Sequence, residues 1–355
     1  MSILVFIIIL IILIFIHELG HFIAAKKNGV LVEEFGFGYP PRIFGKKIGE
    51  TIYSLNLIPL GGFVKIYGED FDEEKRNKKI KKSRSFNHIK PWKKAFILVS
   101  GVLGNFLLGW VLISFLFTQG IPTPANKVII EQVAKKSPAE IAGLKDNDVI
   151  IKAVVAKKEY QIKTTNDLIN LSKKFGGQEI ILVVERTNKQ ISLSITPRKN
   201  PPAGTGPLGV VITSFIEKKY SWYQAPFFGL AEAFNITKQI IVQLVTVLFQ
   251  FITFKKPKVD LTGPIGIAQY TDQAIKFGKN AVLELMALLS LNLAVINIFP
   301  FPALDGGRLV FVIYEWVTKK RVNQNLEKYL NLIGFFLLLT MAVLISINDI
   351  IRLTK

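Results

Sequence analysis

Long apolar runs, separated by charged stretches, dominate the pattern of this chain. The first run begins at Ile3 with the sequence ILVFIIILIILIFI and, after a brief polar interruption, continues to Ala25. Further runs cover residues 95–117, 281–303 and about 330–351. A helix of about 20 apolar residues crosses the hydrocarbon of a bilayer. The pattern therefore predicts four transmembrane helices.

A fifth apolar segment, residues 222–254, carries a polar stripe. Its polar residues recur at intervals of three and four and so fall on one side of a helix: Glu232, Asn235, Gln239, Gln243, Thr246 and Gln250. This spacing favours an amphipathic helix that lies along the outer membrane surface, or is partly inserted, over a fifth crossing.

Two stretches between the apolar runs have the alternation of β-strands. Residues 51–70, TIYSLNLIPLGGFVKIYGED, alternate on either side of a glycine-rich centre at 59–62, which predicts a β-hairpin. The edge of such a hairpin can pair with an extended peptide. Residues 124–216 predict a strand, a short helix at 137–142, a turn, a strand, a helix near 165–174 and two further strands, as in an α+β domain.

Composition places the chain in a bilayer. It has 355 residues, of which 50% are hydrophobic, and a mean hydropathy of +0.37, which is too apolar for an ordinary soluble protein. Its net charge of +19 could indicate nucleic-acid binding, but the lysines crowd into residues 26–94, between the first two apolar runs. That distribution is typical of a cytoplasmic loop, so no nucleic-acid partner is expected. The absence of cysteine excludes disulfides and thiolate metal ligands.

The lysine-rich loop also orients the helices. If it is cytoplasmic, the first helix runs from outside to inside and the second returns, so the α+β domain is extracytoplasmic and both chain ends lie outside. A cleaved signal peptide is disfavoured as the alternative, because no Lys or Arg precedes the first apolar core and no A-x-A-like site follows it. The hydrophobic pattern also lacks the internal repeat that transporters have.

The first apolar run contains ionisable residues, in the sequence FIHELGHFIAA at 15–25. Such groups are costly inside a membrane and normally mark function. His17 and His21 are four residues apart, so both imidazoles project from one face of a helix and can reach the same metal ion. Glu18 lies about 100° around the helix from His17, where it can hold a metal-bound water without ligating the metal. For the two histidines alone, core packing or a proton relay is an equal alternative.

A catalytic zinc needs a third protein ligand, and Asp305 is the best candidate. It follows an apolar segment that Pro300 and Pro302 interrupt, in SLNLAVINIFPFPALDGGRLV at 290–310. These prolines would open the helix and free backbone groups, which a membrane tolerates only where protein lines a cavity. On local sequence alone, Asp305 could instead cap a helix-ending turn.

Several motifs together resemble those of bacterial site-2 proteases, a family of intramembrane zinc metalloproteases. They are HELGH at 17–21, the N-x-F-P-x-P-x-L-D-G pattern at 297–306, PLGG at 59–62 and TGPIGIAQ at 262–269. Between them, SPAEIAGLKDNDVI at 137–150 resembles bacterial PDZ domains, with GPLGV at 206–210 as a candidate peptide-carboxylate loop. The resemblance extends over nearly the whole chain, with one PDZ domain as in the shorter members.

The resemblance implies an enzyme that hydrolyses peptide bonds inside or beside a transmembrane helix. His17, His21 and Asp305 would hold one Zn2+, and Glu18 would act as general base and then as proton donor. The substrates would be single-pass membrane proteins that the enzyme unwinds, such as anti-sigma factors or remnant signal peptides. The PDZ domain would bind or screen their extracytoplasmic part. The enzyme would lie in the bacterial inner membrane, with its active site towards the cytoplasmic side.

The resemblance also assigns residues that contact the substrate. Asn292 and Asn297 would grip the extended substrate strand, although interhelical hydrogen bonding is an alternative role for such amides. Gly61 and Gly62 of the predicted hairpin would lie against the same strand.

Four further residues would support the metal site. Gly101 and Asn105, in SGVLGNFLLG at 100–109, are similar to a small-residue motif of the family's second helix. Close helix packing alone would also explain this pair. Pro300 and Pro302 would shape the loop that delivers Asp305.

The expected fold class is a multi-pass α-helical membrane protein with a four-span metalloprotease core, a cytoplasmic-side β-hairpin and one inserted α+β PDZ domain. The expected divisions are 1–118 for the first two helices and the hairpin, 119–216 for the PDZ domain, 217–275 for the interfacial helix and GPIGI loop, and 276–355 for the last two helices. Two alternatives remain open: a membrane-tethered zinc protease that cleaves non-membrane segments, and a catalytically silent PDZ scaffold. The first would carry its zinc motif outside the spans, and the second would lack Glu18 or Asp305.

Overall fold

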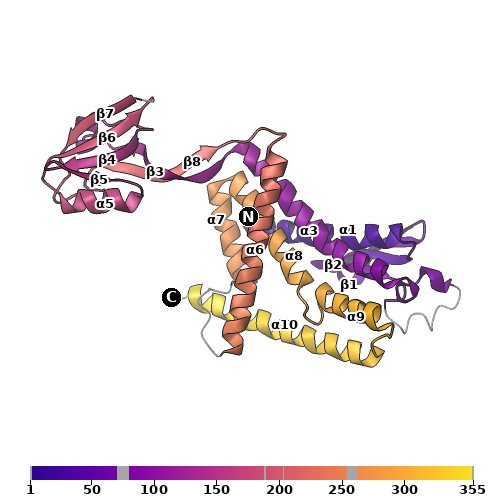
Figure 1. Cartoon of the computed structure of the whole chain (residues 1–355). Helices are drawn as coiled ribbons and strands as arrows, with labels where there is room; N and C mark the ends of the chain where they lie inside the picture. The colour runs from indigo at the N-terminus through magenta and orange to yellow at the C-terminus, as the bar shows by residue number, and fades with distance from the viewer. Residues whose placement is uncertain (1, 70–79, 188, 203, 254–261, 354–355) are drawn as a thin grey trace. The chain divides into compact units, whose positions relative to one another are not determined.

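The computed structural model describes residues 2–69, 80–187, 189–202, 204–253 and 262–353. The chain forms two compact units (Figure 1), residues 1–119 together with 221–355, and residues 120–220. Part of the lysine-rich loop, residues 70–79, and the last residue of the predicted amphipathic helix lie outside the described residues.

The first unit is built on helices. They are α1 (Ser2–Lys27), α3 (Pro91–Gln119), α6 (Ala225–Ile252), α7 (Pro264–Phe277), α8 (Lys279–Ile298), α9 (Asp305–Thr318) and α10 (Gln324–Leu353). Within the described residues, five helices are long and apolar enough to cross a membrane by length and composition: the four predicted ones and α6. The chain therefore has the multi-pass helical character that was expected, and the count of four crossings stays a prediction.

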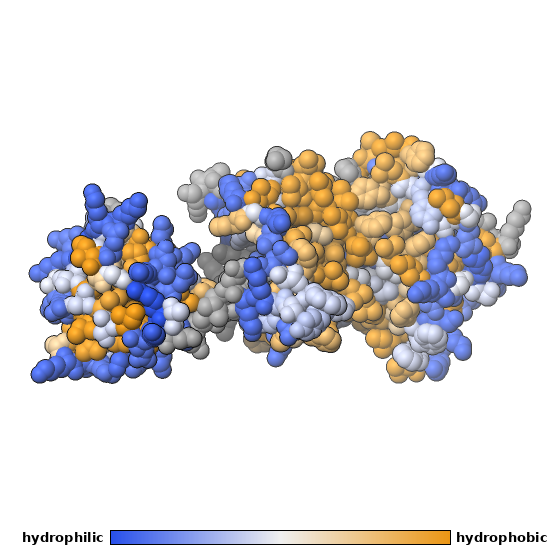
Figure 2. Space-filling view, turned by 90° about the horizontal axis from the view of Figure 1, so that it is seen from above, coloured by the Kyte–Doolittle hydropathy of each residue, from blue (hydrophilic) through white to orange (hydrophobic). Residues whose placement is uncertain are grey.

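Apolar side chains cover the outside of these helices. In Figure 2 they gather over much of the first unit, whereas the second unit is mostly hydrophilic on the same face. On α10, Leu332, Phe336 and Leu344 are each more than half exposed. Apolar surface on this scale matches hydrocarbon rather than water.

Glycines bring α1 and α3 into backbone contact. A Cβ atom on Gly20 would lie 2.2 Å from the carbonyl oxygen of Ser100, and one on Gly104 would lie 2.8 Å from that of Ile16. Neither distance leaves room for a side chain, so glycine is required at both crossings. Such close approach is how helices pack in membranes, where dispersion contacts replace the hydrophobic effect.

Helix α6 packs against α3 on its less polar side. The rings of Phe106 and Phe234 lie 5.0 Å apart, and Trp110 Nε1 donates to the carbonyl oxygen of Pro226 at 2.8 Å. Most of the predicted polar stripe is exposed, namely Asn235, Gln239, Gln243 and Thr246. Apolar side chains of α6 are exposed as well, among them Phe234, Val242 and Phe249, so the amphipathic, surface-lying character of this helix stays a prediction.

The strands β1 (Val32–Ile48) and β2 (Thr51–Ile66) form an antiparallel sheet. Phe35 pairs with both Tyr53 and Val64, so the first part of β1 lies between the two parts of β2. The predicted hairpin, in which residues 51–70 fold on themselves, is therefore wrong in its pairing, although its strands are present. A lone two-stranded hairpin is only marginally stable, and pairing both halves with a third segment satisfies more backbone groups.

A small apolar core joins this sheet to the helices around it. Its buried residues come from α1, the link 28–31, β1, β2, α3, α9 and the 3-10 helix η2 (Phe86–His88), which follows η1 (Lys82–Arg84). They are Ala24, Ala25, Val30, Val32, Ile66, Phe86, Ile97, Leu98 and Val312. This core fixes the end of α1 that carries the histidines relative to α3, α9 and the sheet.

The second unit is an α+β fold with its own core. Its elements are β3 (Ile121–Val133), α4 (Pro138–Ile141), β4 (Val149–Val155), β5 (Lys158–Gln161), α5 (Thr165–Lys174), β6 (Ile180–Arg186), β7 (Lys189–Ile195) and β8 (Val210–Lys218). The sheet order is β7-β6-β4-β3-β8, and β5 pairs with β4. The predicted order of strands and helices is confirmed, and β5 and β8 are additional. Thr164 begins α5 with a capping box that includes Asp167.

Candidate metal centre

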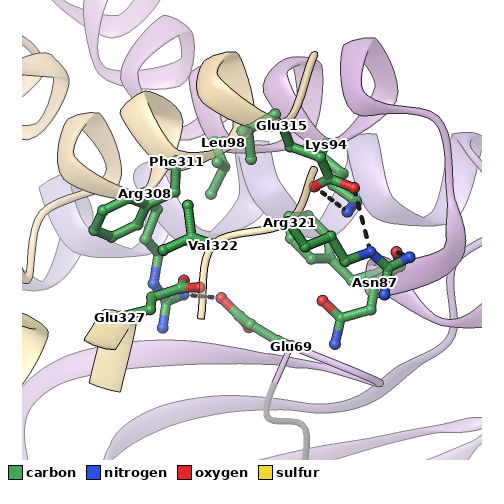
Figure 3. Close-up of a pocket in the computed structure, with 12 residues that line it drawn as sticks. Glu69, Asn87, Lys94, Leu98, Arg308, Phe311, Glu315, Arg321, Val322 and Glu327 are labelled. Atoms are coloured by element: carbon green, nitrogen blue, oxygen red, sulfur yellow. Dashed lines mark hydrogen bonds and ion pairs between the residues drawn. The ribbon is translucent and has the colours of Figure 1, made fainter. Parts of the chain in front are cut away.

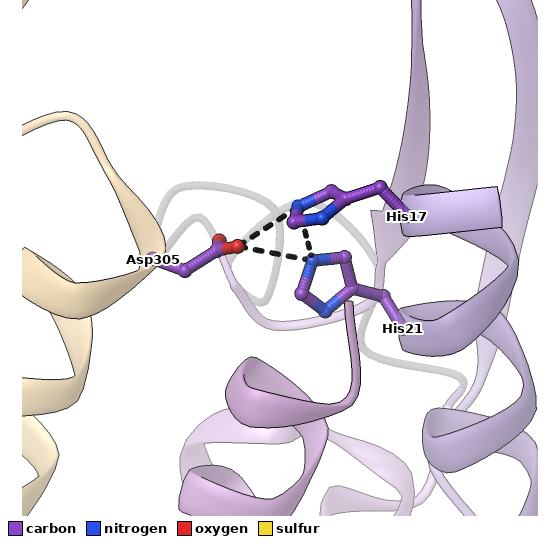
Figure 4. A group of neighbouring side chains, drawn as sticks. All are labelled: His17, His21 and Asp305. Atoms are coloured by element: carbon purple, nitrogen blue, oxygen red, sulfur yellow. Dashed lines mark hydrogen bonds and ion pairs between the residues drawn. The ribbon is translucent and has the colours of Figure 1, made fainter. Parts of the chain in front are cut away.

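Two distant segments of the first unit bring three ligand-bearing side chains together (Figure 4). His17 Nε2 lies 3.0 Å from Asp305 Oδ2, and His21 Nε2 lies 3.3 Å from the same oxygen. The two Nε2 atoms are 3.2 Å apart. His17 and His21 are 9% and 8% exposed, so the cluster is largely shielded from solvent. The prediction that both imidazoles project from one face of the helix is confirmed. The third side chain, Asp305, comes from α9.

The shape of this cluster fits a metal ion. Ligand atoms about 2.1 Å from a tetrahedral zinc are themselves about 3.4 Å apart. The three edges observed here, 3.0, 3.2 and 3.3 Å, are close to that value. Two imidazoles and one carboxylate are also a donor set that zinc accepts, with a position left open for water or substrate.

Helix α3 holds the imidazole rings from behind. His21 Nδ1 donates to the carbonyl oxygen of Ile97 at 2.8 Å, which leaves Nε2 with a lone pair facing the cluster. A Cβ on Gly101 would lie 2.3 Å from His21 Nε2 and 2.9 Å from His17 Cε1. Gly101 therefore does more than let two helices approach, because any side chain here would displace the rings themselves.

Asp305 owes its position to the break between α8 and α9. Helix α8 ends at Ile298, as Pro300 and Pro302 predict. A Cβ on Gly306 would lie 2.2 Å from the carbonyl oxygen of Ile298, so the loop folds back tightly on the end of α8. The N-cap residue of α9 is not Asp305 but Leu304, and no side chain caps that helix. Asp305 is thus free to face the histidines, and the capping role is not the one observed.

The charge state of Asp305 suits a metal ligand. Burial acts to raise the pKa of its carboxyl group, but hydrogen bonds from His17 and His21, formed when their Nε2 atoms carry protons in place of a metal, outweigh burial and hold that pKa below its ordinary value. The carboxylate is therefore ionised at neutral pH. Metal binding requires this deprotonated form.

Glu18 lies between the triad and the β-sheet. It is half-buried on α1 and accepts a backbone hydrogen bond from Val64 of β2. A Cβ on Gly62 would lie 3.4 Å from Glu18 Cγ, so Gly62 packs directly beside this carboxylate. Gly61 has a φ of +101°, a left-handed conformation that favours glycine. The two predicted glycines thus differ: Gly62 contacts Glu18, and Gly61 allows the left-handed backbone conformation within β2.

The structure does not join the two predicted substrate-gripping amides to the triad. Asn292 is exposed on α8, and Asn297 is half-buried one residue before that helix ends. Among the described residues, the hydrogen bonds of the triad reach His17, His21, Asp305, the Ile97 carbonyl and Asn105, and neither of these amides. Their contact with a substrate stays a prediction.

A second cluster of polar side chains lies along α9, and the sequence did not predict it (Figure 3). Lys94 Nζ, on α3, lies 2.8 Å from Glu315 Oε2, and Arg308 pairs with Glu69 just after β2. Arg321 Nε lies 3.4 Å from Glu315 Oε1. We call these five residues the ion-pair cluster. In the sequence Lys94 is one lysine among many in a basic loop, so nothing in its surroundings points to a partner more than 200 positions away.

Comparison with known proteins identifies the family. The family model described as "Peptidase family M50" matches residues 5–341, which is nearly the whole chain. The chain belongs to peptidase family M50. The resemblance to site-2 proteases drawn from the motifs is thereby confirmed.

Individual relatives align over nearly the whole of this chain. A candidate zinc metalloprotease of Clostridium perfringens is 35% identical over 96% of this chain and 95% of the relative. The regulator of sigma-W protease RasP of Bacillus subtilis is 27% identical over 99% of each chain. The zinc metalloprotease RasP of Shouchella clausii is 29% identical over 99% of each. The alignments with the two RasP proteins run over 427 and 433 positions, more than the 355 residues of this chain, so part of each RasP has no counterpart here.

Proposed function

We propose that this protein is an intramembrane zinc metalloprotease that hydrolyses peptide bonds within or next to the transmembrane segments of other membrane proteins. His17, His21 and Asp305 hold one Zn2+, and Glu18 is the general base. The observation that carries the proposal is the convergence of the HExxH motif with Asp305 inside a helical, apolar unit of a family M50 peptidase. The zinc metalloprotease names of its relatives support the choice of metal.

The chemistry divides between metal and chain. Zinc held by His17, His21 and Asp305 would supply a Lewis acid and would make water acidic enough to lose a proton near neutral pH. Glu18 follows His17 directly on α1, and its carboxylate takes that proton. It then returns the proton to the amine nitrogen that leaves, so one group serves as base and acid. His21 would hold the metal through Nε2, since its Nδ1 donates to the Ile97 carbonyl.

The sheet beside Glu18 gives the substrate an extended conformation. A helical substrate resists hydrolysis because each backbone carbonyl is bonded within the helix. Unwound, it can add as a strand to the β1–β2 sheet, whose Gly62 packs against Glu18. Asn292 and Asn297 on α8 would bind the freed backbone groups from another side.

The second unit would select substrates. We assign it as a PDZ domain on the motif SPAEIAGLKDNDVI, and its order of strands and helices supports that assignment. Sidedness follows from charge: α1 ends in Lys26 and Lys27, and its histidines lie in the half nearest those lysines. The active site then faces the cytoplasmic side of a bacterial membrane, the second unit is extracytoplasmic, and α6 lies at the outer surface.

The decisive variant is Glu18→Gln, which removes the base and leaves every ligand. We expect cleavage of a single-pass transmembrane substrate to fall by at least about 100-fold, with one zinc per chain retained by elemental analysis. Glu284→Gln is the matched control, since Glu284 is exposed on α8, away from the triad. Wild-type cleavage by the zinc-loaded Glu18→Gln protein would refute the mechanism. An unfolded soluble protein serves as second substrate, and equal cleavage of it would favour a tethered protease for non-membrane segments.

A further inference from the structure

We infer that Asn105 is a positioning residue for the metal site: its side-chain oxygen accepts a hydrogen bond from His17 Nδ1 and so fixes the ring for metal binding. The inference rests on the proposed zinc site. Asn105 lies on α3 and is fully buried, at 0% exposure. Within the described residues, its Oδ1 has no hydrogen-bond partner. Its Nδ2 lies 3.5 Å from His17 Nδ1.

The reason lies in the tautomer that a metal demands. His17 Nε2 faces Asp305 Oδ2 and His21 Nε2, so a metal held by the triad takes the lone pair of that nitrogen. The ring proton must then be on Nδ1, where it needs an acceptor. An amide NH2 facing this N–H would place two donors against each other, which leaves both unsatisfied.

A rotation of the Asn105 amide resolves the conflict. The oxygen and nitrogen of an amide have nearly the same size and shape, and which is which follows from the hydrogen bonds they make. Turning the group by half a revolution places Oδ1 against His17 Nδ1. The proton on His17 gains an acceptor, and the buried oxygen without a partner gains a donor.

The two histidines then have equivalent supports. His21 Nδ1 donates to the Ile97 carbonyl at 2.8 Å, and no backbone carbonyl does this for His17 within the described residues. Ile97 and Asn105 are eight positions apart on α3, about two helical turns, and so face the same side. Ser290 on α8 donates to the backbone oxygen of Asn105 at 2.7 Å and holds this turn of α3 in place.

Zinc affinity of the purified full-length protein tests the inference, by competition with a chelator. Asn105→Leu keeps a similar shape without an acceptor, and we expect about 10- to 100-fold weaker zinc binding and a changed Co2+ absorption spectrum. Asn105→Asp keeps an acceptor in the same place and should stay within about threefold of wild type. Asn170→Leu, the same change at an exposed position of α5 in the second unit, is the matched control and should change neither.

Each outcome has one meaning. If Asn105→Leu binds zinc as wild type does, or Asn105→Asp loses zinc as badly as Asn105→Leu, the acceptor role is overturned. If wild-type protein itself binds no zinc, it is the proposed function that fails. The chain has three histidines, so 15N-histidine spectra report the His17 tautomer even if the Leu variant does not fold. A proton on Nε2 of His17 in zinc-loaded wild-type protein would also overturn the inference.

Discussion

The first unit contains two clusters of polar side chains that are assembled in opposite ways. In the triad, His17 Nε2, His21 Nε2 and Asp305 Oδ2 converge as three possible acceptors within 3.3 Å of one another. In the ion-pair cluster each charge meets its opposite, as Lys94 meets Glu315 at 2.8 Å. Converging acceptors require a cation from outside, whereas paired charges satisfy themselves. The triad is therefore suited to binding a metal ion, whereas the ion-pair cluster attaches one helix to another.

Helix α9 connects the two clusters. Asp305 is its first residue, Arg308 pairs with Glu69 one turn later, and Glu315 meets Lys94 further along. Lys94 belongs to α3, the helix that also holds the histidine rings through the Ile97 carbonyl. The ion pairs thus fasten the helix that carries the third ligand to the helix that orients the first two.

The largest effect should come from removing a ligand. His21→Ala should weaken zinc binding by more than the roughly 100-fold that loss of an outer-shell partner costs, as measured by chelator competition. His88→Ala is the matched control, because His88 lies in η2 and outside the triad. Stoichiometric zinc at wild-type affinity in the His21→Ala protein would show that the triad is not the metal site.

A smaller effect should follow from breaking the ion-pair cluster. The side chain of Lys94 is only 3% exposed, and Lys94→Met removes the cation closest to Glu315. Loss of one partner from a buried pair costs about 3–5 kcal/mol, but Arg321 stays 3.4 Å from Glu315 Oε1 and is partly exposed. We therefore expect about 2 kcal/mol of lost stability on unfolding in detergent, and weaker zinc binding that excess zinc restores.

Two further variants sharpen this measurement. Lys93→Met makes the same change at the neighbouring position, where the ammonium lies over Trp92 and outside the cluster, and should cost less. Lys94→Met combined with Glu315→Leu removes both charges and should recover much of the loss, since an apolar pair of similar volume replaces a buried ion pair well. A double variant less stable than the single one would contradict this account of the cluster.

The sequence predicted local features well and pairings poorly. The long helices follow from apolar runs, and the placement of His17 and His21 on one face follows from their spacing, because both are properties of one segment. Asp305 was found through its motif. The Ile97 carbonyl could not be found, since a backbone atom leaves no trace in residue identity. The partner of Lys94 lies 221 positions away, and no local pattern encodes such a contact.

The sheet shows the same limit. Alternation identified the strands of β2, but not that both halves pair with β1, whose sequence VEEFGFGYPPRIFGKKI contains charges, glycines and prolines that argue against a strand. Tertiary context overrode those propensities. For α6, length and apolarity favour a membrane crossing, whereas the polar stripe favours the membrane surface. Which position is more stable depends on the bilayer as well as on the chain.

The second unit has a partly buried ion pair, Asp148 with Arg186, and the described residues of that unit contain no group of side chains that could hold a metal. Burial acts to raise the pKa of Asp148, but the Arg186 guanidinium at 2.7 Å and the Lys145 backbone N–H outweigh it and hold that pKa below its ordinary value. The resulting stabilisation is present above the ordinary carboxyl pKa of about 3.9 and is lost as pH falls through the lower, folded value. Asp148→Asn should lower the free energy of unfolding by about 1–2 kcal/mol at pH 7. In this variant that free energy should also fall less steeply as the pH is lowered. If the stability of Asp148→Asn falls with decreasing pH as steeply as that of wild type, carboxylates other than Asp148 cause the loss of stability in acid.

The smallest effect should come from an ion pair that lies at the surface. Lys152 Nζ is 2.7 Å from Glu159 Oε1, as close as the Lys94 pair, but the side chains are 30% and 56% exposed. Water and salt screen such a pair, so Lys152→Met should change unfolding stability by less than about 0.5 kcal/mol. A double-mutant cycle with Glu159→Gln, run at low and high salt, isolates the coupling between the two groups. If this coupling equals that of Lys94 and Glu315, pairing alone determines stability and burial of the ion-pair cluster adds nothing. A coupling near zero at high salt would show instead that burial is what lets the ion-pair cluster hold α9, and with it Asp305, in place.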